Sequence, residues 1–426
     1  MKRINNLYDK MISYSNILYI FNKIKSKCHN KNKLMEFIRY KNSYLIDILE
    51  RLKNNSYTFS NYHIFLIHEK KYRIIMSESI SDKIVNQMIS YFILLPSIKC
   101  LIDSNVATRI GKGSSYGYKL FEKYINNIGI NNDIYILRID ISKYFYNISH
   151  EILISMLERR IKDKKAINIL KIIINLTNYD YINSNIKRLI NNEIDRINKL
   201  NISDKEKDRL INELNSIPLY RNGYGLSIGC LSNQLLAIFF LYDIDHYIKE
   251  ILGCKYYIRY MDDMYILSSD KGYLEYSFKI IRNKLNDLEL NINSKSGIYR
   301  IKEGISFLGY TYSIKNNKLL IRYDNNTIRN INRRLNRFFD IDFSFYYRSI
   351  SSYKGYFIKC NTNLYSDNYR WLCINNIYDK YRVIKSKYSN YIVLIKYKNI
   401  YYTYDNLYGN KYIVLDGNEL KIVNLV

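Results

Sequence analysis

Two adjacent aspartates interrupt an otherwise apolar stretch of the chain. Asp262 and Asp263 lie within residues 256–267, whose β-branched and aromatic side chains predict two strands. Holding two charges between apolar strands is costly unless they lie on a turn or bind a cation. Carboxylates at the tip of a hairpin suit Mg²⁺, a hard cation that keeps its other positions for water and phosphate. A solvated turn is the simpler interpretation, so the pair needs support from the rest of the chain.

A third carboxylate gives that support. Asp140 ends the strand-like run of residues 134–139 and is followed by an apolar and aromatic segment. Phosphoryl transfer with two metal ions needs carboxylates shared between ions about 3.5–4 Å apart. Because Asp140 and Asp262 are far apart in the sequence, only a folded sheet can bring them together. The pattern therefore predicts a two-metal site at the ends of neighbouring strands.

The segment between these aspartates has the features of a ligand-binding loop. Residues 223–234 are punctuated by glycines and lead into the apolar, helix-like residues 235–241. Glycine lets the backbone approach a ligand closely, and polar side chains at a helix start satisfy its free amides. An aspartate after a strand, a glycine loop before a helix and an Asp-Asp hairpin, in this order, are more specific together than separately.

With these motifs in this order, the chain resembles a reverse transcriptase of the bacterial retroelement type. The family's five successive motifs correspond to residues 140–148, 228–234, 260–263, 288–295 and 307–310. Further segments are similar to its fingers, at residues 73–87 and 107–114, and to its thumb, at residues 352–356. The resemblance extends over roughly residues 60–370.

The second motif distinguishes subgroups of that family. Ile228 and Gly229, with Gln234, resemble the diversity-generating retroelement enzymes, which read Ile-Gly-x-x-x-Ser-Gln. Asn233 stands where that group has serine. Two biological settings therefore remain open, a mutagenic retroelement and a related phage-defence system.

The resemblance implies an α+β fold of the right-hand polymerase type. It would have fingers, a palm whose antiparallel sheet has helices behind it, a helical thumb and a small C-terminal α/β module. We place the N-terminal region and fingers at residues 1–133, the palm at 134–315, the thumb at 316–378 and the module at 379–426. Residues 160–215 are charge-rich with helical periodicity and predict a helical insertion in the palm. For the module, nucleic-acid contact and a packing or partner-binding role both remain open.

The implied activity is RNA-directed DNA synthesis by nucleotidyl transfer with two Mg²⁺ ions, for which Mn²⁺ is a possible substitute. The resemblance assigns metal binding to Asp140, Asp262 and the Ile141 carbonyl, with Asp263 as a weaker ligand. It also assigns Lys295 as the acid that protonates pyrophosphate. A basic surface residue is the alternative interpretation of Lys295.

Three further residues are assigned to the nucleotide by the same resemblance. Arg73 would grip the triphosphate, because a guanidinium suits bidentate phosphate contacts. Phe145 would be the gate against the ribose 2′-hydroxyl, or else an ordinary core residue. Gln234 would support the template or the nascent base pair.

Basic residues outnumber acidic ones, 66 to 39, which gives a formal charge of +27. An AT-rich gene could inflate Lys and Tyr, but it does not easily explain this imbalance, which is typical of nucleic-acid-binding proteins. Residues 327–338 predict an amphipathic helix whose basic face would follow duplex phosphates or simply be solvated. The expected nucleic-acid contacts are Gly229, Arg109, Lys112, Arg329, Arg333 and Arg337.

The expected partners are an RNA template, its DNA product and deoxynucleoside triphosphates, with a structured non-coding RNA or a small accessory protein as further candidates. The apolar runs are too short to span a bilayer, so we expect no membrane partner and a cytoplasmic location. Two competing functions remain. One is an RNA-binding palm without catalysis, which the intact carboxylates disfavour. The other is a primer-independent or untemplated nucleotide polymerase of a defence system.

Overall fold

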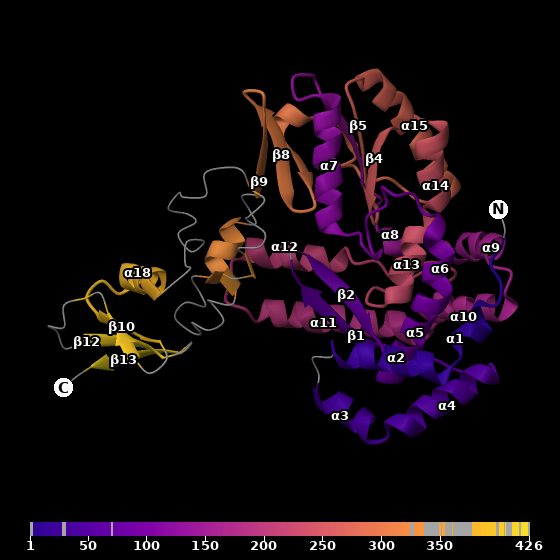
Figure 1. Ribbon diagram of the computed structural model, residues 1–426, viewed down its shortest axis with the longest axis horizontal. Helices are drawn as coiled ribbons and strands as arrows, with labels where there is room; N and C mark the ends of the chain where they lie inside the picture. The colour runs from indigo at the N-terminus through magenta and orange to yellow at the C-terminus, as the bar shows by residue number, and fades with distance from the viewer. Residues whose placement is uncertain are drawn as a thin grey trace. The chain divides into compact units, whose positions relative to one another are not determined.

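The computed structural model describes two compact units of the chain (Figure 1). The first contains Met1–Asn127 and Tyr135–Ile298, and the second contains Ile128–Ile134 and Tyr299–Val426. The described residues are 3–27, 31–69, 71–323, 328–335, 349–350, 352–353, 360, 377–397, 400–403, 405, 411–416 and 419–424.

The first unit begins with four helices and a β-hairpin. The helices are α1 (Leu7–Met11), α2 (Tyr14–Lys25), α3 (Lys31–Arg39) and α4 (Lys41–Lys53). Ser13 caps α2 by accepting a hydrogen bond from the Asn16 amide, and the buried side chains of α2 recur at helical spacing. Strands β1 (His63–His68) and β2 (Tyr72–Ser77) then pair in antiparallel fashion.

The helices that follow contribute to the main hydrophobic core. They are α5 (Ile80–Ile89), a π-helical turn (Ser90–Leu94), α6 (Leu95–Ser97), a 3₁₀ turn (Ile98–Cys100) and α7 (Ser114–Ile128). Asp82, on the first turn of α5, is buried and accepts hydrogen bonds from the Tyr57 and Ser60 hydroxyls. The start of α5 is thereby joined to the segment that leads into β1.

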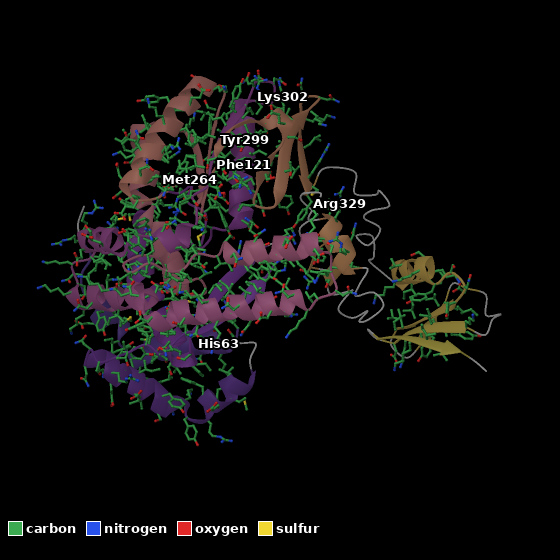
Figure 2. The ribbon with its side chains drawn as sticks, turned by 180° about the vertical axis from the view of Figure 1, so that it is seen from behind. His63, Phe121, Met264, Tyr299, Lys302 and Arg329 are labelled. Carbon is green, nitrogen blue, oxygen red and sulfur yellow. The ribbon has the colours of Figure 1, made fainter. Side chains whose placement is uncertain are left out.

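A four-stranded sheet carries the strands that lead to the predicted aspartates. Its strands are β3 (Tyr135–Ile139), β4 (Tyr256–Tyr260), β5 (Asp263–Ser268) and β6 (Gly297–Arg300), in the order β4-β5-β3-β6. Successive residues of β5 alternate between two layers, as expected for a strand buried on both faces. The Tyr265 ring meets Phe121 of α7 edge-on, whereas Met264 belongs to the main core cluster (Figure 2).

The chain between β3 and β4 is mostly helical, and one further helix follows β5. They are α8 (Tyr144–Asn147), α9 (His150–Arg160), α10 (Lys164–Asn175), α11 (Asp180–Asn198), α12 (Asp204–Asn215), α13 (Leu231–Phe240), α14 (Tyr242–His246) and α15 (Lys271–Asp287), with a 3₁₀ turn at Leu176–Asn178 and a π-helical turn at Tyr247–Ile251. Helices α11 and α12 pack against the β1–β2 hairpin, where Glu213 accepts the Tyr72 amide at 2.6 Å. The segment expected to be a helical insertion therefore braces that hairpin.

The second unit contains two further sheets. A 3₁₀ turn (Ile301–Glu303) precedes β7 (Ile305–Phe307), β8 (Tyr310–Lys315) and β9 (Lys318–Tyr323), which form a meander in that order. Asn316 and Asn317 both have positive φ, as the tight turn between β8 and β9 requires. Residues 328–335 are helical.

The C-terminal part of this unit is a small sheet with one described helix. It comprises α18 (Ile377–Lys387), β10 (Ile392–Tyr397), β11 (Ile400–Tyr402), β12 (Lys411–Asp416) and β13 (Glu419–Asn424), with strand order β11-β10-β12-β13. Strands β10 and β12 are parallel. Asp405 joins helix to sheet, because it accepts hydrogen bonds from the Tyr381 hydroxyl and the Val393 amide. Across the described residues, no helix is both long and apolar enough to cross a membrane.

Candidate active site

Strand register brings the three predicted aspartates to one edge of the central sheet. Ile139 of β3 lies opposite Met264 of β5, so the next positions on the two antiparallel strands are Asp140 and Asp263. The β4–β5 pairing ends with Tyr260 opposite Asp263, which leaves Met261 and Asp262 as a two-residue turn. The carboxylates therefore gather where β3 ends and β5 begins.

Mutual repulsion and burial act on these carboxylates. Burial, followed by the charge of Asp263 and a smaller effect of Asp140, raises the pKa of Asp262 from 3.8 to about 6. Burial also raises the pKa of Asp263, although Arg138 opposes this with Nη2 at 3.6 Å from Asp263 Oδ1. One guanidinium does not neutralise three carboxylates, so the site favours a further positive charge.

A divalent cation suits this donor set. No three His, Cys, Asp or Glu side chains in the described parts of the chain are grouped closely enough to hold a metal ion unaided. Mg²⁺ needs no such cage, because one or two carboxylates, water and substrate phosphates complete its coordination. The unneutralised carboxylates and a hard-oxygen donor set therefore fit a metal that is shared with substrate.

The backbone around Ile141 adds one more oxygen donor. Ile141 forms an isolated antiparallel bridge with Ile292, held by Ser142 N–H to the Asn291 carbonyl at 2.8 Å and by Asn293 N–H to the Asp140 carbonyl at 2.7 Å. These two bonds flank the bridge, so they leave the Ile141 carbonyl out of the pairing. That carbonyl is available as the metal ligand expected from the sequence.

The loop after α15 fixes Asp140 and carries Lys295. The Asp140 amide donates to Ser296 Oγ at 2.9 Å, and Ser296 Oγ returns a bond to the Asp140 carbonyl at 3.2 Å. Lys295 is exposed beside this anchor, and its amide bonds to Asn293 Oδ1. Its position beside the aspartate is compatible with the proton-donor assignment, which stays a prediction.

The three nucleotide-binding candidates lie on separate elements of the first unit. Arg73 is exposed on β2, and no ion pair of its guanidinium is found within the described residues. Phe145, on α8, is half-buried against the main core, and its carbonyl accepts the Leu226 amide at 2.7 Å. Gln234 is half-buried on the first turn of α13. Their assignments stay predictions.

Gly229 is required by a close approach of two backbones. The Met76 amide of β2 donates to the Ile228 carbonyl at 2.9 Å. A Cβ added at Gly229 would lie 2.3 Å from the Met76 carbonyl oxygen, and its φ of +137° also disfavours a side chain. The glycine loop and the strand that carries Arg73 are therefore one connected structure.

Asn233 has an internal structural role. It is buried at the start of α13 and donates to Ser227 Oγ at 2.7 Å and to the Ser227 carbonyl at 3.2 Å. The preceding amide, Ser232 N–H, donates to Asn86 Oδ1 at 3.1 Å. The residue that departs from the retroelement motif thus holds the glycine loop to the helix.

Two of the basic residues expected to contact nucleic acid have partners within the protein. Arg109 Nη1 donates to the carbonyls of Ile102 at 2.6 Å and Asn105 at 3.0 Å. Lys112 Nζ lies 2.6 Å from Asp103 Oδ1. These contacts stabilise the loop before α7, and a role in nucleic-acid binding stays a prediction for both residues.

The basic helix of the second unit is described only in part. Residues 328–335 bury Ile328, Ile331 and Leu335 and expose Arg329 and Arg333 (Figure 2 labels Arg329). Arg337 lies outside the described residues. The described turns therefore have one apolar and one basic face.

Sequence reasoning missed a buried ion pair next to the site. Arg259 of β4 and Asp245 of α14 are both fully buried, with Nη2 at 2.6 Å from Oδ2. Arg259 stands three residues before Asp262, but strand periodicity gives no sign of a partner on a helix. A charge inside an apolar strand was the available signal.

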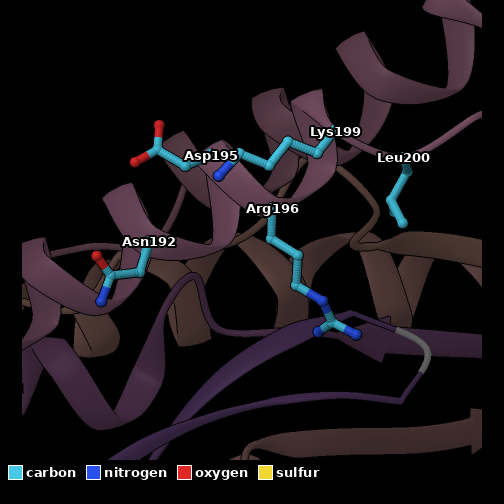
Figure 3. Close-up of a pocket in the computed structure, with 5 residues that line it drawn as sticks. All are labelled: Asn192, Asp195, Arg196, Lys199 and Leu200. Atoms are coloured by element: carbon cyan, nitrogen blue, oxygen red, sulfur yellow. The ribbon is translucent and has the colours of Figure 1, made fainter.

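A surface pocket is found elsewhere in the first unit, at the end of α11 (Figure 3). It is shallow, and none of the three aspartates lines it. Arg196 projects from the helix and also pairs with Glu193 at 3.4 Å. The lining residues are Asn192, Asp195, Arg196, Lys199 and Leu200.

Comparison with known proteins agrees with this geometry. Residues 53–312 match the family described as reverse transcriptase (RNA-dependent DNA polymerase), a match that includes all three aspartates. The chain is also 26% identical over 370 residues to the "Putative COX1/OXI3 intron 2 protein" of Saccharomyces cerevisiae. That alignment covers 73% of this chain and 39% of the yeast protein, so the chain spans well under half of that relative.

The family match confirms the predicted fold class. Reverse transcriptases have the right-hand polymerase fold and use divalent metal ions, and the observed mixture of helices and antiparallel strands is the α+β arrangement expected. Because the match covers more than half of the sequence, this chain belongs to the reverse transcriptases, the family of RNA-directed DNA polymerases.

Proposed function

We propose that this chain copies RNA into DNA by adding deoxynucleotides to a primer at the edge formed by β3 and β5. The observation that carries the proposal is the convergence of Asp140, Asp262 and Asp263 within the family-matching segment. Arg138 offsets only part of the charge of Asp263, and burial beside Asp263 raises the pKa of Asp262, as expected of a site that binds cations together with a triphosphate.

Asp140, Asp262 and the Ile141 carbonyl would hold two Mg²⁺ ions, or Mn²⁺ in their place, with Asp263 as a weaker ligand. Bound there, the ions would make the primer 3′-hydroxyl a better nucleophile and neutralise the developing charge on pyrophosphate. The protein itself orients these donors. The Ser296 and Asn293 bonds fix Asp140, and the short turn after Tyr260 fixes Asp262.

The side chains around this edge would bind the nucleotide. Arg73, exposed on β2, would hold phosphate oxygens through its guanidinium fork. Phe145 would exclude a ribose 2′-hydroxyl, and Gln234 would support the template or nascent pair. Lys295 would donate a proton to the departing pyrophosphate. The Met76–Ile228 and Gly229 contacts support this proposal, because they join the Arg73 strand to the Gln234 loop.

The nucleic-acid partner would be an RNA template paired with its DNA product. The exposed arginines of residues 328–335 lie in the segment that we assign to a thumb at 316–378, between a palm at 134–315 and a C-terminal module at 379–426. The fingers would occupy residues 1–133. A structured non-coding RNA or a small accessory protein would complete the complex.

The biological setting that we favour is a diversity-generating retroelement or a phage-defence system of bacterial type. The support is Ile228-Gly229 together with Gln234, and Asn233 in place of serine leaves both settings open. The genes beside this one distinguish them. A template and variable repeat pair indicates a retroelement, and a cassette of defence genes indicates phage defence.

Primer extension tests the proposed activity. Purified protein with Mg²⁺ is given a primed RNA template and the deoxynucleotides, and parallel reactions contain a primed DNA template, ribonucleotides, no primer or no template. We expect template-length DNA from the primed RNA. Nucleotide addition only without template or primer would favour an untemplated or primer-independent polymerase, and binding without any synthesis would favour a non-catalytic RNA-binding protein.

A further inference from the structure

Arg259 is a fully buried arginine that contacts the Met261–Asp262 turn. Its side chain is among the largest that are completely buried, and its partner Asp245 is equally buried. Removing two charges from water carries a large desolvation cost, which is recovered only where the geometry is excellent and the remaining donors are satisfied. The hydrogen bonds of this buried pair must therefore offset its desolvation cost.

The guanidinium contacts three different parts of the backbone fold. Its Nε and Nη2 donate to the two Asp245 oxygens at 2.7 and 2.6 Å, a bidentate fork on α14. Nη2 also donates to the Ile238 carbonyl of α13 at 2.8 Å. Nη1 donates to the Met261 carbonyl at 2.6 Å.

The Met261 carbonyl belongs to the turn that presents Asp262. Met261 has a φ of 57°, a left-handed conformation that a side-chain-bearing residue adopts at a cost and keeps only where its surroundings enforce it. The two-residue hairpin turn itself favours this φ, and Nη1 of Arg259 adds a donor that binds the carbonyl of the peptide joining Met261 to Asp262. The same guanidinium ties that peptide to the helix that carries Gln234.

We propose that Arg259 is a positioning residue for catalysis, which holds the Met261–Asp262 peptide in register with α13 and α14 so that Asp262 faces Asp140. Asp245 acts through Arg259, since its fork fixes the plane of the guanidinium. This inference rests on the proposed polymerase function and deepens it.

The geometry separates this role from ordinary core packing. Asp245 also accepts the Tyr257 hydroxyl at 2.7 Å, and its Oδ2 lies 3.4 Å from Asn105 Nδ2. The strand itself is held by the Arg259 amide and carbonyl, which bond to Ser104 and Val106. Those contacts and the pairing with β5 hold β4. The bond from Nη1 to Met261 acts on the turn that follows the strand.

Two variants separate position from stability. In Arg259→Met/Asp245→Leu, an apolar pair of similar volume replaces the ion pair, an exchange that is often neutral for stability. It removes the donor to Met261 and leaves no buried charge, but it also takes the acceptor from the buried Tyr257 hydroxyl and Asn105 amide, which lowers stability. Arg259→Lys keeps the charge but lacks the planar fork that reaches three acceptors at once. Arg159→Met is the control, because Arg159 forms an exposed ion pair with Asp243 of the same helix α14.

The readouts are kcat and KM for the deoxynucleotide, primer–template affinity, the melting temperature and hydrogen exchange across residues 256–268. We expect the double variant to fold with a lowered melting temperature and to bind primer–template normally, but to lose about 10²-fold in kcat, the size of effect that a misplacement of about 1 Å produces. KM should change little. Amides of the turn should exchange faster, while those of β4 and β5 should not.

Several outcomes would overturn the inference. A folded double variant with kcat within about threefold of wild type would show that Arg259 serves only stability. Unchanged hydrogen exchange of the turn amides would also show that Arg259 serves only stability, independently of any activity measurement. If wild type proves inactive, the proposed function fails, and hydrogen exchange alone decides the positioning role. If the double variant does not fold, Arg259→Lys is judged by the same readouts, with Arg159→Met expected to match wild type throughout.

Discussion

Replacing Asp262 should stabilise the metal-free protein while abolishing its activity. Burial and the neighbouring Asp263 raise the pKa of Asp262 from 3.8 to about 6, so the folded protein favours the protonated carboxyl. The stability from this preference is complete below about pH 4 and is lost as pH rises through about 6. Above that pH the ionised carboxylate is a net burden, which Asp262→Asn removes.

The size of the effect follows from the shift. Each pKa unit corresponds to about 1.36 kcal/mol, so raising the pKa from 3.8 to about 6 corresponds to about 3 kcal/mol. Asp262 is partly exposed, and solvent screening reduces this to about 1–3 kcal/mol. Near pH 8 in EDTA, Asp262→Asn should therefore melt above wild type, by about 2–4 °C for each kcal/mol. The difference should vanish near pH 4.

Thermal unfolding in EDTA between about pH 4 and 8, followed by addition of Mg²⁺ near pH 8, measures the change in stability, and primer extension with Mg²⁺ measures the loss of activity. Mg²⁺ should stabilise wild type and narrow its gap to Asp262→Asn, because the cation binds the ionised carboxylate. Asp208→Asn, on the exposed face of α12, is the control and should stay within about 0.5 kcal/mol of wild type. Parallel pH profiles for wild type and Asp262→Asn, or a less stable variant near pH 8, would refute the reasoning.

Three further perturbations test other parts of the account. Gly229→Ala should destabilise by about 2–6 kcal/mol, because a strained φ and a Cβ that would lie 2.3 Å from the Met76 oxygen each cost about 1–3 kcal/mol. Gly253→Ala has a positive φ but nothing within 4 Å of its Cβ, so it should cost about 1 kcal/mol; equal unfolding free energies for the two variants would contradict this. Phe145→Ala should raise ribonucleotide over deoxynucleotide incorporation by at least about tenfold in competition assays, whereas an unchanged ratio in an active variant would make Phe145 a core residue only. Arg329→Glu/Arg333→Glu should make the salt dependence of primer–template binding less steep, because each lost phosphate contact reduces the magnitude of the slope of log K against log salt by about 0.7–0.9. Lys187→Glu/Lys205→Glu is the control, and an equal slope for the two double variants would place these arginines in solvent.

Local patterns sufficed to find the carboxylates. Asp140 and Asp262 each directly follow or interrupt a strand-like run, and strand ends are where a sheet brings distant residues together. The apolar residues after the glycine loop likewise indicated the helix now seen as α13. These inferences needed only periodicity and the order of motifs.

Long-range partners were beyond the sequence. Arg259 pairs with Asp245 on a separate helix, and although a charge inside an apolar strand suggests burial, nothing in the local pattern identifies its partner. Arg109 and Lys112 were expected to contact nucleic acid because they lie in the segment that resembles the family's fingers, yet carbonyls and a carboxylate of the preceding loop engage them. Charge alone does not tell which cations fold inward, because that depends on acceptors that only the folded chain brings close.

The most direct test of the central claim is the rate of single deoxynucleotide addition by Asp140→Asn on a primed RNA template, with primer–template affinity measured in parallel. The account predicts a loss of at least about 10³-fold, or about 4 kcal/mol of transition-state stabilisation, with affinity unchanged because phosphate contacts elsewhere supply it. Addition by Asp140→Asn at a rate within about tenfold of wild type, at the same Mg²⁺ concentration, would contradict the assignment of this edge of the sheet as the active site.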